Sequence, residues 1–462
     1  MRALAATALA VLATALIATQ PASAAGPPQN PFLAANPFSN IHNDTWMSDA
    51  YAIAGPTAGA RAAYGPYSPS VCGSLAFDRL HRIVSVCPSA AVAPQARIFD
   101  PHSLRIVSTY NLPQAPDAAG TVGFQNFTGG GYFFLDRRDR AWIATKTSHL
   151  FVLAVAKHGF HKLADYNLRR VLGSQQRVTS ALPDFRGRIW FVSKRGGVVG
   201  VLDPRTRRIR ITRADSEIEN SFAVGSDGVY IVSERSMYRF GVARGGRPVV
   251  QWKSTYRNSG VHKPGQVDAG SGTTPTIMPG GYVSITDNAD PMDVVVYRTA
   301  RHLASGQRRV VCQVPVFHKG ASDTENSLIG SGRSMIVENN YGYRGFAEPA
   351  ANTVTSPGFA RVDIDRNGRG CHRVWQVLRH SAPSVVPKLS TRTGLIYTYT
   401  REPGAIATWS WTALSFKTGR TAFQVTAGSG TAYNNNYAGI AIGPGGAAYL
   451  GTIGGLAALR KP

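Results

Sequence analysis

Two Glu-Asn pairs stand out in a chain of 462 residues in which only 16% of the side chains are charged. Glu325-Asn326 and Glu338-Asn339 lie near the two ends of residues 323–343, and an apolar, glycine-containing stretch separates them. Two carboxylates can act as acid and base on a glycosidic bond. Carboxylates beside amide oxygens can instead bind Ca²⁺. The pairs therefore predict either glycan chemistry or a metal site.

Histidines offer a second kind of chemistry. His42 lies in a polar and aromatic cluster at residues 40–51, and His262 lies in a long loop together with Arg257 and Lys263. Imidazole can accept a proton near neutral pH. A His or Tyr base beside Arg or Lys suits a uronate lyase, because removing the proton next to a carboxylate requires that the carboxylate charge be neutralised.

The candidate residues fall into a catalytic set and a substrate-binding set. The catalytic candidates are Glu325, Glu338, Asp287, His42, His262 and Tyr341. The candidates for substrate binding are Arg257, Lys263, Lys146, Lys194, Lys388, Arg401, Tyr399 and Asn435. A structural interpretation competes for each residue, since Asn and Asp side chains satisfy free backbone groups in turns and many histidines are structural.

These residues flank a repeated unit in which an apolar strand, a tight turn with Gly or Asp, and a second apolar strand follow one another. The second strands of these hairpins end at Cys87, Thr145, Ser193, Ser233, Thr286, Glu338, Thr400 and Thr452. A third and a fourth strand follow, and four antiparallel strands per repeat are typical of a β-propeller blade. The sequence predicts an all-β fold with a single propeller. Eight blades are favoured, seven blades are the alternative, and separate sandwiches are a competing fold.

The propeller geometry predicts where the polar residues meet. The first strand of each blade is innermost, so its start and the loop after the second strand open on one face around the channel. We expect Asp287, Glu325 and Glu338 to share one sector of that rim. The last repeat ends one strand short, and we predict that residues 46–53 supply the missing strand and close the ring.

The N-terminus predicts export. Arg2 precedes an Ala-rich apolar run, and Ala22-Ser23-Ala24 is a small-x-small cleavage site, as in secretory signal peptides; a membrane anchor is the alternative. No later stretch approaches the ~20 apolar residues of a spanning helix. We divide the chain into a signal peptide (1–24), a lead with the closing strand (25–60) and the propeller (61–462), and expect a secreted, extracellular monomer.

Cysteines and charge agree with an extracellular setting. An even number of cysteines in an oxidising compartment suggests two disulfides. We favour Cys72–Cys87 across one hairpin and Cys312–Cys371 between outer strands of adjacent repeats. The net charge of +24 concentrates anions, so an anionic polymer or glycan is the expected partner. The alternative is that the basic charge has no specific role, because a basic isoelectric point is common across the proteomes of some exporting organisms. Nucleic acid is not favoured, because no basic run with interleaved aromatics occurs.

The strand–turn alternation and connectors such as "VLDPRT" at 201–206 resemble the repeats of quinoprotein-like propellers and, more loosely, of gluconolactonase/regucalcin propellers. The second resemblance implies a central metal held by Glu, Asn and Asp. The nearest counterparts here are Glu325, Asn326, Asp287 and Asn436. The first implies pyrroloquinoline quinone (PQQ), but the vicinal disulfide and the regular tryptophan signature of that family are missing. The cofactor prediction is therefore no cofactor or Ca²⁺.

The predicted signal peptide, the strongly positive net charge and the polar rim together favour a carbohydrate-active enzyme. We predict hydrolysis or β-elimination of an extracellular, acidic glycan at the channel mouth. The alternatives are a Ca²⁺-dependent lactonase or esterase of the regucalcin type, a quinoprotein dehydrogenase, and a non-enzymatic propeller that binds an anionic polymer or a protein.

Overall fold

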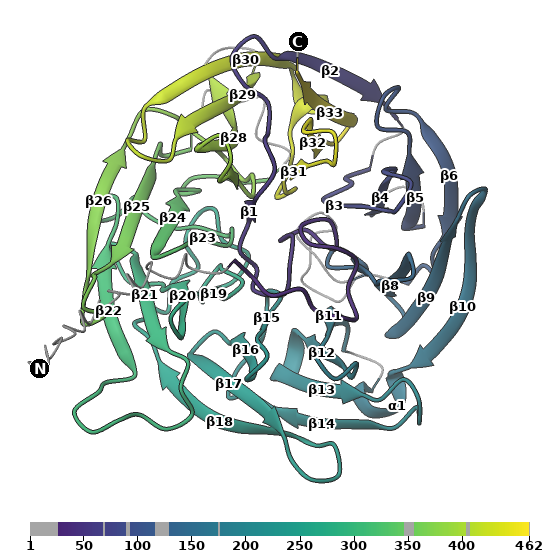
Figure 1. Cartoon of the computed structure of the whole chain (residues 1–462), viewed down its shortest axis with the longest axis vertical. Helices are drawn as coiled ribbons and strands as arrows, with labels where there is room; N and C mark the ends of the chain where they lie inside the picture. The colour runs from purple at the N-terminus through teal and green to yellow at the C-terminus, as the bar shows by residue number, and fades with distance from the viewer. Residues whose placement is uncertain are drawn as a thin grey trace, which may run out of the picture.

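The computed structural model is a ring of eight β-sheets around a central axis, and we call the region around this axis the channel (Figure 1). It describes residues 26–67, 70–88, 93–115, 129–173, 176–345, 355–402 and 407–461. Each sheet has four strands that succeed one another outward from the channel, and one sheet has a short fifth strand at its inner edge. The predicted fold, a single propeller of eight four-stranded blades, is confirmed.

The first four blades take their strands in chain order from the inner to the outer edge. Blade 1 contains β3 (Ser74–Phe77), β4 (Ile83–Cys87), β5 (Gln95–Phe99) and β6 (Ile106–Asn111). Blade 2 contains β7 (Phe134–Leu135), β8 (Arg140–Ala144), β9 (His149–Ala156) and β10 (Gly159–Asn167). Blade 3 contains β11 (Val178–Pro183), β12 (Ile189–Ser193), β13 (Val198–Leu202) and β14 (Ile209–Arg213). Blade 4 contains β15 (Ala223–Val224), β16 (Val229–Val232), β17 (Ser236–Val242) and β18 (Pro248–Thr255).

The remaining blades follow the same order. Blade 5 contains β19 (Thr276–Met278), β20 (Tyr282–Thr286), β21 (Asp293–Arg298) and β22 (Val310–Pro315). Blade 6 contains β23 (Ile329–Ser331), β24 (Ser334–Glu338), β25 (Phe359–Ile364) and β26 (Cys371–Val377). Blade 7 contains β27 (Lys388–Ser390), β28 (Leu395–Glu402), β29 (Thr408–Ser415) and β30 (Thr421–Ser429), and blade 8 contains β31 (Ala441–Ile442), β32 (Ala448–Gly451) and β33 (Gly455–Arg460).

Helical structure is confined to loops. The short elements are α1 (Arg169–Leu172), η1 (Arg195–Gly197) and η3 (Thr431–Tyr433). In the part of the chain that the structure describes, none of the helices has the length and apolar character needed to cross a membrane.

An N-terminal strand closes the ring, but it is not the predicted one. β2 (Arg61–Pro66) pairs antiparallel with β33 and becomes the outer strand of blade 8. The expected segment, residues 46–53, forms only β1 (Ala50–Tyr51), which pairs parallel with β27 at the inner edge of blade 7. The prediction of 46–53 as the closing strand is therefore wrong. The pattern of apolar residues showed that a strand was missing, but not which edge each N-terminal segment would reach.

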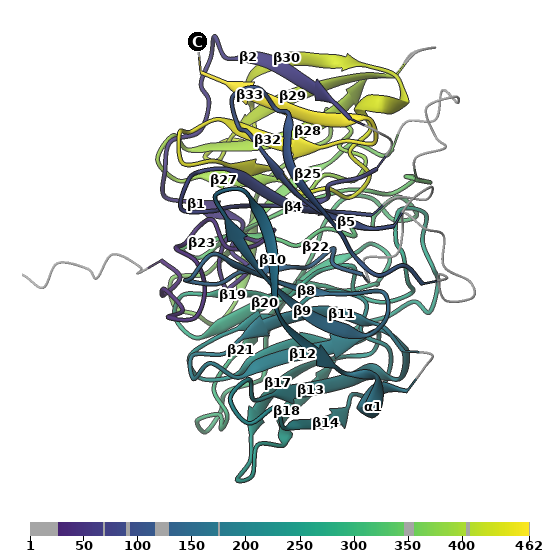
Figure 2. The same cartoon turned by 90° about the vertical axis from the view of Figure 1, so that its right-hand side faces the viewer.

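The lead before β1 lies inside the ring, where the purple segment crosses the centre of Figure 1 and lies toward one face of the disc in Figure 2. Its carbonyls accept hydrogen bonds from inner strands of successive blades. The bonds run from Leu135 N to Ser39 O (2.8 Å), Val224 N to Thr45 O (2.6 Å), Ile277 N to Trp46 O (2.9 Å), Gly330 N to Ser48 O (2.8 Å) and Leu389 N to Asp49 O (3.0 Å). The lead thus satisfies backbone donors that line the channel, which would be costly to leave buried and unpaired.

Hydrophobic burial decreases from the channel outward. All residues of the second strands β4, β12 and β24 are buried, whereas the outer strands β6, β14 and β30 alternate between exposed and half-buried positions. Runs of Val, Ile and aromatic residues in the inner strands suit burial on both faces, and alternation in the outer strands suits a sheet with one face in water.

An Asp side chain organises the first turn of several blades. In blade 2, Asp136 Oδ1 accepts the backbone N–H groups of Arg138 (2.8 Å) and Arg140 (3.1 Å). Its Oδ2 accepts Arg140 Nε (2.6 Å) and Trp142 Nε1 (2.9 Å). Asp184 makes the corresponding bonds in blade 3. Because one carboxylate satisfies both the turn and a buried indole, the repeat of Asp, Arg and Trp in the sequence has a structural cause.

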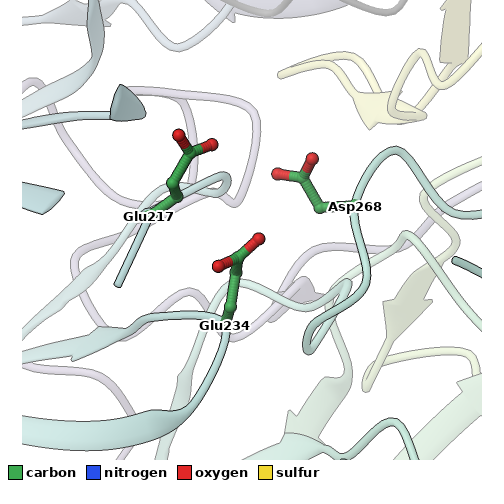
Figure 3. A group of neighbouring side chains, drawn as sticks. All are labelled: Glu217, Glu234 and Asp268. Atoms are coloured by element: carbon green, nitrogen blue, oxygen red, sulfur yellow. The ribbon is translucent and has the colours of Figure 1, made fainter. Parts of the chain in front are cut away.

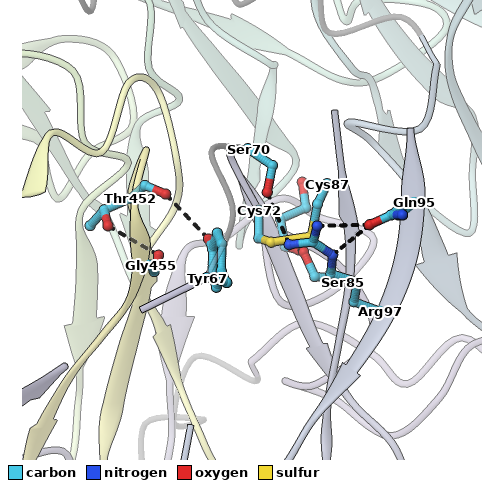
Figure 4. The surroundings of a disulfide bond; sticks show 10 residues. Tyr67, Ser70, Cys72, Ser85, Cys87, Gln95, Arg97, Thr452 and Gly455 are labelled. Atoms are coloured by element: carbon cyan, nitrogen blue, oxygen red, sulfur yellow. Dashed lines mark hydrogen bonds between the residues drawn. A yellow bond between two sulfur atoms is a disulfide. The ribbon is translucent and has the colours of Figure 1, made fainter. Parts of the chain in front are cut away.

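Both predicted disulfides form. Cys72–Cys87 links the start of blade 1 to the end of β4, and Cys312–Cys371 joins the outer strands β22 and β26 of adjacent blades. Close to the first bond, Arg97 donates to Ser70 Oγ (3.0 Å) and Gln95 Oε1 (3.0 Å) (Figure 4). Tyr67, which follows the closing strand, donates to the carbonyl of Thr452 in blade 8 (3.2 Å). The junction between the first and last blades is therefore held by covalent and polar links.

Candidate active site at the channel mouth

Antiparallel strands divide the loops between two faces. Starts of the inner strands and loops after the second strands lie on one face; we call the channel opening there the mouth. Turns between the first and second strands and between the third and fourth strands lie on the other, which we call the turn face. The N-terminal lead accepts its backbone hydrogen bonds near the turn-face ends of the inner strands. It therefore forms a floor beneath the mouth.

The two Glu-Asn pairs meet at the mouth end of blade 6. Asn326 Nδ2 donates to Glu338 Oε1 (2.6 Å), and Asn340 Nδ2 donates to the same oxygen (3.0 Å). Burial raises the pKa of Glu338 to about 8, although both amides act in the opposite direction. Glu338 is thus protonated at neutral pH, and its role in this geometry is to join β24 to the start of β23.

Glu325 lies in a different environment from Glu338. Its Oε2 accepts the backbone N–H of Val267 (3.0 Å), while Oε1 is buried without a hydrogen-bond partner in the described part of the chain. Burial raises the pKa of Glu325 well above its ordinary value, and nearby Asp268 and Asp323 add to the rise. A neutral carboxylic acid at this position can donate a proton or a hydrogen bond.

Lys194, Glu219 and Asp268 form the polar rim of the mouth. Lys194 Nζ lies 2.5 Å from Glu219 Oε2 and 3.1 Å from Asp268 Oδ1. Burial and then Asp268 raise the pKa of Glu219 well above its ordinary value. Burial opposes the charge on Lys194, but the two carboxylates outweigh it and raise the pKa of the ammonium. One cation therefore lies in contact with two acidic side chains, and the side chains of Lys194 and Asp268 are each 20% exposed.

A group of three acidic residues lies beside this rim. One oxygen each from Glu217, Glu234 and Asp268 lies within 4.8 Å of the other two (Figure 3). Burial raises the pKa of Glu234, and the charges of Asp268 and Glu217 raise it further. These carboxylates are close enough to share a divalent cation, since Ca²⁺ is held by oxygen ligands of this kind.

His42 belongs to the floor and is held there by a buried ion-pair network. Its Nδ1 is 3.1 Å from both carboxylate oxygens of Asp49, and Ser327 Oγ donates to Asp49 Oδ2 (2.5 Å). The ammonium of Lys388 donates to Asp49 Oδ1 and to the carbonyl of Ile41. Burial alone would raise the pKa of Asp49, but Lys388 and His42 lower it below the ordinary value. Asp49 therefore stays ionised and can hold Nδ1–H.

The other nitrogen of His42 makes no hydrogen bond that the described structure shows. Nε2 is buried and has no hydrogen-bond partner among the described residues. The His42 ring stacks on Tyr132, with centroids 6.2 Å apart, and the Tyr132 hydroxyl donates to Asn220 Oδ1 (3.0 Å). Because Ser327 and Asp49 both approach Nδ1, this is not a relay in which His42 activates Ser327 through one nitrogen and is held through the other. The free lone pair points instead to Nε2 as a proton acceptor.

Asp287 does not join these groups in any contact of the described structure. Its Oδ1 accepts the backbone N–H groups of Ala289 (3.1 Å) and Asp293 (2.8 Å). Burial, together with Asp293, raises the pKa of Asp287 to about 7. Arg257 lies 3.0 Å from Asp293 Oδ2. The expectation that Asp287 shares a working sector with Glu325 is not supported, since its carboxylate organises the loop between β20 and β21.

The predicted Ca²⁺ ligands are committed to different partners. Asn326 donates to Glu338 and Asn340 Oδ1, and Asn436 Oδ1 accepts the Tyr343 hydroxyl (2.9 Å). Asp287 Oδ1 receives two backbone N–H groups. The acidic side chains that the structure does bring within reach of one ion, in its described residues, are Glu217, Glu234 and Asp268.

Most predicted substrate-binding side chains lie inside the protein. Lys388, Tyr399 and Asn435 are fully buried, and Lys146 and Arg401 nearly so. Lys263 Nζ donates to two backbone carbonyls, those of Ala289 (2.5 Å) and Ser322 (3.1 Å). Of this set, Lys194 at the rim and Arg257 near Asp293 retain substantial exposure. Position next to a strand end located these residues correctly, but it did not predict whether a side chain points outward.

The remaining catalytic candidates separate in space from His42. His262 Nε2 contacts the carbonyl of Gln266 (2.5 Å) in its own loop, and the backbone N–H of Tyr341 donates to Asn339 Oδ1 (3.2 Å). The groups that sequence reasoning missed are Tyr132, Asp49 and Ser327. The buried Lys388 signals that a carboxylate must be nearby, but its partner lies in the distant lead.

The chain belongs structurally to the eight-bladed propellers, and its similarities to known proteins indicate fold rather than activity. No family model matches it. It is 28% identical over 269 residues to an uncharacterized protein of Archaeoglobus fulgidus, and this match spans 52% of each chain. The chain therefore spans about half the length of the curated relative it matches.

Two solved structures share the fold over most of their length. The quinohemoprotein alcohol dehydrogenase of Comamonas testosteroni is 11% identical, with 95% of this chain and 81% of that chain covered and a TM-score of 0.57. A europium-containing methanol dehydrogenase is 10% identical, with 91% of each chain covered and a TM-score of 0.54. At these identities the likeness shows the propeller alone.

The quinone cofactor implied by the quinoprotein resemblance does not fit this mouth. PQQ carries several carboxylates, whereas the mouth presents Glu217, Glu219, Glu234, Asp268 and Glu325. The nearest cation, Lys194, already contacts Glu219 and Asp268. The described mouth residues therefore offer one cation, already shared by two acidic side chains, for the several carboxylates of PQQ, and this donor set does not fit that cofactor.

Replacing Lys388 with Met is expected to lower the free energy of unfolding by about 3–5 kcal/mol, because it leaves Asp49 ionised and buried without its partner. Denaturant unfolding measures this loss. The double variant Asp49→Asn/Lys388→Met should be more stable than Lys388→Met alone. Lys253→Met removes the solvent-exposed Lys253–Asp215 pair and serves as the control, with a much smaller loss because water screens the pair. Equal losses in the two Lys variants would contradict the role of Lys388.

The raised pKa of Glu338 predicts a pH dependence of stability. The folded protein binds this proton more tightly than the unfolded chain, so the stabilisation is complete below the ordinary Glu pKa and is lost as the pH rises through about 8. Glu338→Gln, which keeps an acceptor for Asn326 and Asn340, should flatten the decline in unfolding free energy between pH 5 and 8. Glu402→Gln, at an exposed position, is the control and should leave the slope unchanged.

Proposed function

We propose that this protein is an exported enzyme that cleaves an acidic extracellular glycan by β-elimination at the channel mouth. The observation that carries the proposal is the state of His42. Asp49 fixes its Nδ1, and its Nε2 has no partner among the described residues. A histidine in this arrangement is suited to act as a general base.

The reaction assigns a part to each group. His42 Nε2 removes the proton from the carbon next to the uronate carboxylate, the C–H electrons form a carbon–carbon double bond, and the bond to the leaving sugar oxygen breaks. Glu325, whose pKa is raised by burial, supplies the proton for that oxygen. Lys194 donates a hydrogen bond to the substrate carboxylate, which reduces the cost of the developing charge.

Spacing argues against hydrolysis by the pair Glu219 and Asp268. Glycoside hydrolysis uses carboxyl groups about 5–5.5 Å or about 6.5–9.5 Å apart. Lys194 Nζ lies within 3.1 Å of both Glu219 and Asp268, and Asp268 is close enough to raise the pKa of Glu219 through a hydrogen bond. A pair in such contact leaves no room for a sugar ring or a water molecule between its members.

His42→Gln is expected to reduce turnover of a susceptible polyuronate by about 100-fold or more, measured as the ultraviolet absorbance of the unsaturated product across a panel of acidic glycans. His262→Gln is the matched control, since that ring contacts its own loop, and it should retain activity. Shortened chains without new absorbance would contradict elimination. If the wild-type protein shortens no glycan of the panel, the enzymatic proposal fails.

A Ca²⁺-dependent lactonase or esterase is the second candidate, and the group of Glu217, Glu234 and Asp268 favours it. Titration calorimetry of the wild-type protein with Ca²⁺ should show one binding event, which Glu217→Gln/Glu234→Gln should weaken about tenfold or more because it removes two anionic ligands. Glu402→Gln should bind as the wild type does. Absence of binding in the wild type would remove this candidate without affecting the test of His42.

A further inference from the structure

A cavity of about 370 Å³ opens on the turn face between blades 2 and 3, opposite the mouth. Its walls come from the β7–β8 turn, the β11–β12 turn, the β13–β14 turn and the lead. The arginines that line it are Arg137, Arg138, Arg140, Arg186, Arg188 and Arg205. Its volume falls within the range of small-molecule pockets, about 300–1,000 Å³.

Two of these arginines make a rigid base for the cavity. Arg140 is fixed by Asp136 (2.6 Å) and Arg188 by Asp184 (2.7 Å). Each of these Asp residues also accepts an indole N–H. Since the carboxylates are satisfied by several donors at once, they hold the guanidinium groups in place and cancel their charge.

The other arginines leave a positive excess. For the side chains of Arg138 and Arg186 the described residues show no hydrogen bond or ion pair, and both are exposed. Arg205 is also exposed, and its charge helps to lower the pKa of Asp203 in the same lining. The carboxylate of Asp203 accepts the backbone N–H of Arg205 (2.9 Å) rather than its side chain. Several guanidinium groups thus surround one cavity and can each bind an anion in a two-pronged manner.

Phe32 of the lead supplies an apolar wall. Its ring lies against Gly187, where a Cβ atom would approach Phe32 to 2.6 Å and where φ is +81°. The guanidinium of Arg137 lies 5.9 Å from the centre of the same ring. A glycine is required at this turn both for its backbone conformation and for the close approach of the ring. The β11–β12 turn therefore fixes the position of the Phe32 ring at the cavity wall.

We propose that this cavity binds an anionic sugar residue of an acidic polysaccharide, at a site separate from the mouth. The arginines pair with its carboxylate or sulfate groups, and Phe32 packs against the ring. Single-stranded nucleic acid is less suited, because it requires rows of exposed aromatic rings for stacking. The large exposed hydrophobic side chains of the described residues are all aliphatic. The site would hold a polymer on one face of the disc.

The test is binding of short oligosaccharides, measured by calorimetry in low salt. The probes are a tetramer of galacturonate, the same tetramer with its carboxylates methyl-esterified, a sulfated tetrasaccharide, inorganic phosphate and a short single-stranded DNA. We expect the galacturonate or sulfated tetramer to bind, the esterified tetramer to bind at least tenfold more weakly, and added salt to weaken binding. The two anionic tetramers distinguish carboxylate from sulfate recognition.

The variants locate the site. Arg138→Glu/Arg186→Glu should weaken binding of the anionic tetramer about tenfold or more. Arg169→Glu/Arg170→Glu makes the same change of charge on the exposed α1, outside the cavity, and should change binding less than threefold. Phe32→Ala should weaken binding of the anionic tetramer but leave phosphate binding unchanged, because it removes the apolar wall of the cavity without changing its charge.

Binding is measured in the His42→Gln background as well, so that failure of the proposed chemistry at the mouth leaves this result intact. The proposal is overturned if neither anionic tetramer binds, or if both double variants weaken binding equally. It is also overturned if DNA binds through Arg138 and Arg186 while the tetramers do not.

Discussion

The buried ion pair of Lys388 and Asp49 is the interaction on which the arrangement of the channel depends. Both side chains are 0% exposed, and a charge buried this deeply is tolerated only when it is paired and hydrogen-bonded. The pair connects the first strand of blade 7 to a lead segment more than three hundred residues earlier in the chain. It thereby holds Asp49 in the position from which Asp49 orients His42.

The lead has a second physical role, because the inner strands of a propeller present an edge to the channel. Backbone donors from blades 2, 4, 5, 6 and 7 bond to carbonyls of the lead between Ser39 and Asp49. These bonds remove the need for water inside a narrow apolar ring. The same hydrogen bonds fix the lead as a polar floor of the channel. The segment that bonds to the inner strands therefore also supplies part of the candidate site.

Charge is divided between the two faces of the disc. Carboxylates gather at the mouth, where burial raises the pKa values of Glu219, Glu325 and Glu338. Arginines gather at the turn face, where Asp136 and Asp184 neutralise only some of them. The overall charge of +24 therefore does not describe the mouth. An anion would be attracted to the turn face rather than to the mouth.

The sequence by itself determined the repeat, the eight blades, both disulfides and the meeting of the two Glu-Asn pairs, because these follow from strand periodicity and from contacts within one hairpin or between neighbouring blades. Only the tertiary structure decided the rest. β2 rather than residues 46–53 closes the ring. Lys388, which was predicted to bind substrate, forms a buried ion pair with Asp49 instead. Such partners come from segments far apart in the chain, and no local pattern records which of two polar side chains will face the other once the ring has closed.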